Sequence, residues 1–194
     1  MKLPRIIGIA GTNGAGKDTL GELLAERCNY KFVSVSDILR EELTRNDIPH
    51  EREHMSNLST EWAREHGPGV LSMKTIEAYV EIEKAEGYNG LVIGSIRRPA
   101  EAHAVQDEGG VVLWVDADQR TRYQRIQANN RDRVTDRLSY EQWVAEEERE
   151  MYPKTDDPTV LNMSATKNAC DITVMNDFAT QEEYREYLIK EFEL

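Results

Sequence analysis

Residues 8–19 read GIAGTNGAGKDT, and this stretch decides the expected fold. An apolar run leads into it, four residues separate Gly11 from Gly16, and Lys17 follows directly. Leucines at helical spacing continue after the lysine, so a strand, a glycine-rich turn and a helix are expected in this order. That order, with this spacing of glycine and lysine, is typical of a loop whose backbone N–H groups bind phosphate.

The amino end of the helix that follows supplies the chemistry of this loop. Unpaired N–H groups and the positive end of the helix dipole attract anions there, and glycines let the backbone come close to them. Lys17 is expected to span two phosphate groups and to neutralise charge that develops during transfer. The candidate nucleotide-binding residues are Gly11, Asn13, Gly14, Ala15, Gly16, Lys17, Asp18 and Thr19.

Asp18 occupies the position at which a serine or threonine usually contacts Mg²⁺. Its carboxylate can accept a hydrogen bond from a water molecule on the metal, since Mg²⁺ keeps much of its hydration shell. The alternative is that Asp18 only stabilises the helix, because acids near a helix N-terminus interact favourably with the dipole. The sequence leaves both roles open.

The bulk composition is that of an acidic globular chain. Its 194 residues are enough for one domain, and its formal net charge of −12 argues against a nucleic-acid partner. Cys28 and Cys170 lie far apart, in no metal-like spacing, and are expected to be reduced thiols of a cytoplasmic protein. No segment has the roughly 20 apolar residues of a membrane span, so no membrane partner is expected.

Five short apolar runs are predicted to be buried strands, and helical patterns separate them. The runs cover residues 5–10, 31–35, 91–94, 111–115 and 172–175. Alternating strands and helices predict an α/β fold with a parallel sheet and helices on both faces. Residues 36–88, with sequence for about three helices, and the arginine-rich residues 128–141 are expected to be insertions where substrate-closing segments lie.

The loop resembles those of nucleoside monophosphate kinases and their relatives, and GKDT at 16–19 resembles in particular those of deoxynucleoside monophosphate kinases. The resemblance implies a P-loop NTP hydrolase fold in one domain, residues 1–194, with five parallel strands in the order 2-3-1-4-5. It implies that residues 36–88 bind the acceptor and that 128–141 form a lid. ATP and Mg²⁺ are the implied cofactors, with Thr19 facing the α-phosphate.

Two further segments extend the resemblance to the acceptor side. FVSVSDILREEL, residues 32–43, resembles a pattern of adenylate kinases, which implies that Asp37 and Arg40 belong to the acceptor site. GLVIGSIRRPAEAHAV, residues 90–105, resembles the third strand and the turn that presents an arginine to the acceptor phosphate. Arg97 matches that arginine, and its neighbour Arg98 is the alternative.

The second half of the chain resembles the lid and the adenine side of these kinases. RYQRIQANNRDRVTDR, residues 122–137, resembles the lid, whose arginines close over the transferring group. Its candidates are Arg125, which we assign to nucleotide binding, and the catalytic candidates Arg131, Arg133 and Arg137. CDITVMNDFATQEEYREYL, residues 170–188, resembles the end of dephospho-coenzyme A kinases, which implies that Asn176 and Asp177 lie near the adenine.

One departure from the family concerns the metal. These kinases usually end the third strand with an aspartate that orients the water molecules of the metal, and here that place reads Gly94-Ser95. Asp37, Asp18 and Asp116 are the alternatives for this role. We expect Asp18 and Asp37 to contact Mg²⁺ through water.

The expected function is transfer of the γ-phosphoryl group of ATP to a nucleoside or deoxynucleoside monophosphate, by a monomer or homodimer. Dephospho-coenzyme A is the alternative acceptor, and Asp37 is then the candidate catalytic base for its attacking hydroxyl. A P-loop ATPase or switch without a small acceptor is a further alternative. HEREH, residues 50–54, also matches the H-E-x-x-H motif of zinc peptidases, which requires both histidines on one helix. No third ligand follows at the usual spacing, where Asn57 and Thr60 stand.

Overall fold

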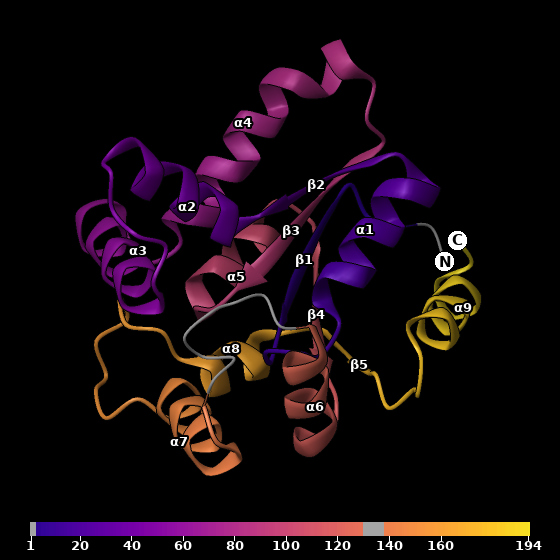
Figure 1. Ribbon diagram of the computed structural model, residues 1–194. Helices are drawn as coiled ribbons and strands as arrows, with labels where there is room; N and C mark the ends of the chain where they lie inside the picture. Colours follow the sequence, from indigo (N-terminus) through magenta and orange to yellow (C-terminus); the bar gives the residue numbers. More distant parts are fainter. Residues whose placement is uncertain (1–2, 130–137) are drawn as a thin grey trace.

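The structure is a computed structural model that describes residues 3–129 and 138–194. Five parallel strands form one sheet in the order β2-β3-β1-β4-β5, which confirms the predicted fold and strand order. The strands are β1 Ile6–Gly11, β2 Tyr30–Ser34, β3 Gly90–Ile96, β4 Val111–Asp116 and β5 Ile172–Met175. Figure 1 shows the sheet at the centre of the molecule with helices around it.

Two hydrophobic cores lie on opposite faces of the sheet, because successive strand residues point to opposite sides. Ile7 and Ile9 of β1 pack against α1 Lys17–Cys28 and α9 Gln181–Phe192. Ile6 and Ala10 of the same strand pack with residues of α5 Pro99–Asp107 and α8 Met163–Ala169. Helices on both faces therefore fix the position of β1, whose carboxyl end leads into the glycine-rich loop.

Three helices lie between β2 and β3, within the segment predicted to be an insertion. They are α2 Val35–Arg45, α3 Arg52–His66 and α4 Val70–Glu86. Leu39, Leu71 and Tyr79 from these helices are buried in the same core as α5. Figure 1 shows α2 and α3 together at the left, and α4 running from beside them to the top of the view.

Two more helices, α6 Gln119–Asn129 and α7 Tyr140–Met151, follow β4. The predicted catalytic arginines of the lid, Arg131, Arg133 and Arg137, lie outside the described residues. Figure 1 shows α6 and α7 near the end of the sheet at which α8 also lies. Both helices contribute side chains to the candidate site, Arg122 from α6 and Glu150 from α7.

A β-bulge shapes the carboxyl end of β3. Ile9 pairs with Gly94 and Ala10 with Ile96, so Ser95 is an extra residue, and its φ of 66° lies in the left-handed region. A bulge reverses the alternation of side chains beyond it. Ile96 therefore faces the same core as Ile93, and the chain after it turns toward the glycine-rich loop.

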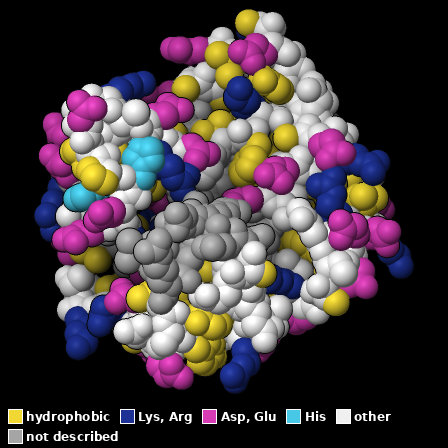
Figure 2. Space-filling model, viewed as in Figure 1, with side chains coloured by type: hydrophobic (Ala, Val, Ile, Leu, Met, Phe, Trp, Pro, Cys, Tyr) yellow, Lys and Arg dark blue, Asp and Glu magenta, His cyan; other side chains and the backbone are white. Residues whose placement is uncertain are grey.

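The surface carries charge of both signs, with acidic side chains in excess over the whole sequence. Figure 2 shows Asp and Glu side chains interspersed with Lys and Arg over the visible face. Within residues 3–129 and 138–194, no helix combines the length and the apolar character that a bilayer crossing demands.

Candidate active site

The glycine-rich loop has a backbone that other residues could not adopt. Gly11, Gly14 and Gly16 have φ values of 138°, 78° and 96°. A Cβ at Gly11 would lie 2.0 Å from the carbonyl oxygen of Val115, and one at Gly16 would lie 2.5 Å from Nδ2 of Asn176. The glycines are therefore required by the close approach of β4 and of the segment after β5, as well as by the turn itself.

The amide groups of this loop are available to an anion. The backbone N–H groups of Asn13, Gly14 and Gly16 find no acceptor anywhere in residues 3–129 and 138–194. Helix α1 begins directly afterwards at Lys17, so its dipole adds positive potential at the same place. Backbone donors converging on a helix N-terminus are the usual binding site for phosphate.

Lys17 is already held within the loop. Its Nζ donates a hydrogen bond of 2.6 Å to the carbonyl oxygen of Thr12. Burial, followed by the charge of Arg97, lowers the pKa of Lys17 to about 8, although Asp18 acts in the opposite direction. A polyanion in the loop would favour the charged lysine, because an opposite charge nearby raises the pKa of an ammonium group.

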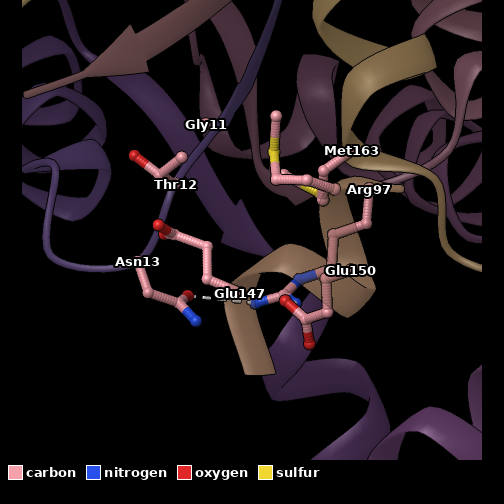
Figure 3. A pocket seen from close by; sticks show the side chains of 8 residues that line it. Gly11, Thr12, Asn13, Arg97, Glu147, Glu150 and Met163 are labelled. Carbon is pink, nitrogen blue, oxygen red and sulfur yellow. Dashed lines mark hydrogen bonds and ion pairs between the residues drawn. The ribbon is translucent and has the colours of Figure 1, made fainter. Parts of the chain in front are cut away.

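Arg97 reaches the phosphate-binding loop from the end of β3. Its Nη2 donates to Oδ1 of Asn13 at 3.2 Å and its Nη1 to Oε2 of Glu150 at 3.1 Å, as Figure 3 shows. Its backbone N–H donates to Oε2 of Glu101 at 2.8 Å, which fixes the start of the turn. The structure therefore brings together Arg97 and the loop that binds phosphate.

Glu150 of α7 bridges two arginines. In addition to Arg97 it accepts a hydrogen bond of 2.9 Å from Nε of Arg52 on α3, and it forms an ion pair with the same guanidinium. Burial alone would raise the pKa of Glu150, but the charges and hydrogen bonds of Arg97 and Arg52 hold it below its usual value. The carboxylate is therefore ionised at neutral pH.

A small pocket of about 240 Å³, open to solvent, lies between the loop, β3 and α7. It is lined by Gly11, Thr12, Asn13, Arg97, Glu147, Glu150, Met151 and Met163. Figure 3 shows the carboxylate of Glu147 pointing toward Thr12 and that of Glu150 lying beside Arg97. The pocket thus has the loop on one side and an arginine with an acidic partner on the other.

Arg122 joins α6, α7 and the loop. Its two terminal nitrogens bind the carboxylate of Glu147, with 3.0 Å between Nη2 and Oε2. Its Nε donates to the carbonyl oxygen of Ala117 at 2.9 Å, and Nη1 lies 3.4 Å from the carbonyl oxygen of Asn13. The guanidinium also lies over the ring of Trp143, 5.3 Å from its centroid. These contacts make Arg122 a positioning residue of the loop.

Asp116, at the end of β4, binds Thr12 of the loop. Its Oδ1 accepts hydrogen bonds from Oγ1 of Thr12 at 2.9 Å and from the backbone N–H of Ala117 at 3.0 Å. Its Oδ2 accepts from Nε1 of Trp114 at 3.0 Å and from Nζ of Lys167 at 3.1 Å. Burial acts to raise the pKa of Asp116, but these hydrogen bonds lower it overall. Both oxygens already have protein donors, so Asp116 suits a structural role better than a metal-binding one.

The residues predicted to lie near the adenine are close to the loop. Asn176 is buried and donates from Nδ2 to the carbonyl oxygen of Ala15 at 2.8 Å. Nη2 of Arg125 donates to the carbonyl oxygens of Asn176 at 3.0 Å and Phe178 at 2.8 Å. Asp177 accepts from the backbone N–H of Asp118 at 3.2 Å.

Asp37 and Arg40 lie in the first half of α2, where they form an ion pair with each other. Asp37 is 63% exposed, and within the described part of the chain neither residue has a hydrogen bond or ion pair with Lys17 or Arg97. The helix begins at Val35, so Asp37 is not its N-terminal cap. At the place where the kinases carry an aspartate, Oγ of Ser95 lies 3.1 Å from Oγ of Ser34.

Arg98, the alternative to Arg97, is a structural residue. Its side chain is only 1% exposed, and its guanidinium binds Oε1 of Glu101 at 3.1 Å, Oγ of Ser59 at 2.9 Å and the carbonyl oxygen of Thr159 at 2.9 Å. It holds α3 against the turn after β3 and is not accessible to an acceptor. The choice between the two arginines therefore falls on Arg97.

The zinc-peptidase interpretation of residues 50–54 requires a helix that the structure does not form there. Helix α3 begins only at Arg52, so His50 precedes it and binds Oγ1 of Thr44 at 2.8 Å. His54 lies 2.9 Å from the carbonyl oxygen of Pro49. No group of three metal-ligating side chains occurs in the described ranges, and Figure 2 shows histidines on the surface of this region. The two histidines therefore cannot share a helix face.

Comparison with known proteins supplies the family. A family profile described as an AAA domain matches residues 7–153. The chain belongs to this AAA-domain family. The matched range begins within β1 and ends just after α7. It includes the glycine-rich loop, Arg97 and Glu150, which line the pocket.

Relatives of this AAA-domain protein include kinases. A UPF0200 protein of Pyrococcus horikoshii is 26% identical over 150 residues, which cover 75% of this chain and 78% of that protein. An adenylate kinase of Encephalitozoon cuniculi is 28% identical over 137 residues, 70% of this chain and 72% of that one. A shikimate kinase from Acinetobacter baumannii, solved with shikimate, has a TM-score of 0.55 at 14% identity, covering 98% of this chain and 93% of its own. The fold is thus that of P-loop kinases.

Four charged residues of the candidate site were not predicted from the sequence. They are Arg52, Arg122, Glu147 and Glu150. Arg122 had a usable signal, because it follows the carboxyl end of a parallel strand, where ligands bind. Glu147 and Glu150 are three apart on one helix and so share a face. Arg52 carries no local signal, since its role depends on how α3 packs.

Proposed function

We propose that this protein transfers the γ-phosphoryl group of ATP to a nucleotide-like acceptor, a nucleoside or deoxynucleoside monophosphate. The observation that carries the proposal is the approach of Arg97 to the phosphate-binding loop, with 3.2 Å between its Nη2 and Oδ1 of Asn13. In the proposed site, Arg97 would bind a second anion beside the loop that would hold the first. The likeness to an adenylate kinase supports the same reading.

The loop fits the phosphates of ATP. Its amides, which have no acceptor in the described part of the chain, and Lys17 offer donors to two phosphate groups, and the glycines keep side chains out of the cradle. We assign Gly11, Asn13, Gly14, Ala15, Gly16, Asp18 and Thr19 to this cradle. Arg125, Asn176 and Asp177 are assigned to the adenine side. Asn176 contacts Ala15 of the loop, and Arg125 binds the carbonyl oxygen of Asn176.

Oxygen donors suited to Mg²⁺ lie near the same loop. Asp18 follows Lys17 in the first turn of α1, and a carboxylate is a preferred ligand of this ion, directly or through water. We assign Asp18 to such a contact, and Asp37 as a more distant second. The ion, when bound with ATP, would supply positive charge to the phosphate oxygens.

The protein would act by positioning and by electrostatics, with little covalent chemistry of its own. Lys17 and the loop amides hold oxygens that gain negative charge as the phosphoryl group moves. Arg97 orients the acceptor, and Asp37 and Arg40 extend the acceptor side along α2. Residues 36–88 are then the acceptor-binding part and 128–141 the lid, to which Arg131, Arg133 and Arg137 belong.

A monophosphate acceptor needs no general base. Its attacking oxygen is already largely ionised, because the second pKa of a phosphate monoester is about 6. A hydroxyl acceptor such as dephospho-coenzyme A must lose a proton. The pocket carboxylates Glu147 and Glu150 are paired with arginines, and Asp37, the remaining candidate base, is paired with Arg40. This difference favours the monophosphate class.

The test is ATP consumption by the purified protein with Mg²⁺ and a panel of acceptors. The panel contains nucleoside and deoxynucleoside monophosphates, dephospho-coenzyme A and a sample with no acceptor. We expect consumption only with monophosphates, and formation of the corresponding diphosphate. Equal consumption without any acceptor would favour an ATPase, and consumption with dephospho-coenzyme A alone would favour that kinase.

A further inference from the structure

We propose that Glu150 is an internal competitor for the acceptor: its carboxylate occupies the place between Arg52 and Arg97 into which the acceptor phosphate binds. The inference rests on the proposed function and deepens it, because it assigns Arg52 to the acceptor site and names a residue that sets specificity there. A phosphate must displace Glu150 to bind, so acceptors without a doubly charged group are rejected.

The geometry is that of one anion shared by two cations. Oε2 of Glu150 accepts from Nη1 of Arg97 at 3.1 Å, and Oε1 accepts from Nε of Arg52 at 2.9 Å. Arg97 follows the end of β3 and Arg52 is the first residue of α3, so the two arginines are far apart in sequence and are joined by this carboxylate. Arg97 also contacts Asn13 of the loop, so the shared anion lies next to the phosphate-binding site.

The three side chains are only partly exposed, and this exposure permits exchange. The side chains of Glu150, Arg97 and Arg52 are 21%, 25% and 32% exposed. A ligand can therefore reach the two guanidinium groups from solvent, and neither of them is fully buried. Arg97 and Glu150 of the bridge line the same pocket as Thr12 and Asn13 of the loop.

Charge decides which anion wins. One carboxylate neutralises only one of the two guanidinium groups, so the bridge retains a net charge of about +1. A phosphate monoester carries about −1.5 to −2 charges at pH 7 and offers three oxygens, which suits two planar guanidinium groups. A neutral hydroxyl or a single carboxylate gains nothing over Glu150. The internal acid thus makes the site selective for phosphate.

The experiment uses the full chain and inorganic phosphate as the probe. Phosphate affinity is measured by calorimetry in wild type, Glu150→Gln and Glu146→Gln, and the acceptor KM is measured wherever turnover exists. Glu146 is the matched control, because it lies on the same helix, loses the same charge, and pairs with the exposed Arg149. Far-UV circular dichroism and thermal melting establish that each variant is folded.

We expect Glu150→Gln to bind phosphate about 10-fold more tightly, which corresponds to about 1.4 kcal/mol, and to lower the acceptor KM similarly. Glu146→Gln should match wild type. The gain should vanish in Arg52→Met/Glu150→Gln, because phosphate that binds only at the loop does not depend on Arg52. Glu150→Asp, whose shorter side chain cannot bridge both arginines, gives a second variant with an intermediate gain.

Unchanged phosphate affinity in both Glu150→Gln and Glu150→Asp would overturn the inference, and so would a gain that persists without Arg52. The two proposals fail separately. Phosphate binding needs no turnover, so a chain that transfers nothing to any monophosphate refutes the proposed function while tighter phosphate binding still supports the competitor. A chain that is an active kinase with no effect at Glu150 refutes the competitor alone.

Discussion

Nζ of Lys17 lies 2.6 Å from the carbonyl oxygen of Thr12 and donates a hydrogen bond across the phosphate-binding loop. The contact ties the ammonium group to the loop, in which the amides of Gly14 and Gly16 have no acceptor within the described residues. A bound phosphate would compete with this carbonyl for the same donor. The lysine is therefore in place before a nucleotide arrives, which reduces the entropy lost on binding.

Replacing Lys17 tests the role of this group in transfer. We expect Lys17→Ala to lower kcat by about 10²–10³-fold with the fold intact, because the lysine acts on oxygens that become more negative in the transition state. Lys154→Ala, at an exposed position, is the control. Retention of more than about a tenth of wild-type turnover would contradict the assignment, given that expected loss.

The pKa of Lys17 predicts how ATP affinity depends on pH. With a pKa of about 8 in the free loop, the lysine is charged below pH 8 and neutral above it. ATP favours the charged form, so binding takes up a proton above pH 8 and affinity falls as the pH rises. Titration calorimetry from pH 7 to 9.5, in two buffers of different ionisation enthalpy, measures both effects. Lys17→Met should remove the proton uptake, and a wild-type Kd that stays constant over this range would refute the prediction.

Asp116 should stabilise the fold through the four donors it binds. We expect Asp116→Asn to lower the free energy of unfolding by about 1–3 kcal/mol at pH 7, because a side-chain amide cannot accept from all of them. The folded-state pKa is depressed, so this stabilisation is present above about pH 4 and is lost as the pH falls through the folded value. Urea unfolding of wild type and Asp116→Asn at pH 7 and pH 3.5 should show a smaller difference in the free energy of unfolding at the lower pH. If this difference is equal at both pH values, the ionisation of Asp116 does not cause it.

Arg98 and Glu101 form a buried ion pair, and losing one partner should destabilise the fold more than losing both. Glu101→Ala would leave the guanidinium of Arg98 without its counter-charge, which typically costs about 3–5 kcal/mol. Arg98→Met/Glu101→Leu removes both charges and should cost much less than the sum of the single changes. Chemical denaturation of the three variants measures this coupling. Additive losses would show that the two residues act independently.

Asp37 distinguishes the two classes of acceptor. Its side chain is exposed and, among the described residues, pairs only with Arg40 on the same helix, so Asp37→Asn should change stability by less than about 0.5 kcal/mol. With a monophosphate acceptor we expect a modest rise in acceptor KM and little change in kcat. If kcat instead falls by about 10²–10⁴-fold, as for loss of a general base, the acceptor is a hydroxyl compound.

The fold was predictable because its signals are local. The apolar runs, the spacing from Gly11 to Lys17 and the helix start at Pro99 each depend on residues close in sequence, and each corresponds to an element of the structure. Arg97 could be placed at the end of a parallel strand by the same reasoning. The exclusion of Arg98 could not, because Ser95 adds a bulge that changes which side chains face the core.

The remainder of the site depends on contacts between distant segments. Arg52 meets Glu150 across 98 positions, and Arg122 meets the carbonyl oxygen of Asn13 across 109. No periodicity in the sequence encodes such pairs, since they arise from how the helices pack around the sheet. The histidines of residues 50–54 show the converse, because a matching motif falls where the helix has not yet begun.

The position of Trp114 makes its fluorescence a candidate reporter of the glycine-rich loop. Its indole is fully buried, donates to Oδ2 of Asp116, and lies under the ammonium group of Lys167, 5.4 Å from the ring centroid. Asp116 in turn binds Thr12 of the loop. The emission of an indole responds to charges and hydrogen bonds around its ring. A chain in which phenylalanine replaces Trp62 and Trp143 would carry a single tryptophan, two hydrogen bonds away from Thr12 of the loop. Occupancy of the loop could then be followed by ultraviolet light in real time, on the unlabelled protein with unlabelled nucleotide.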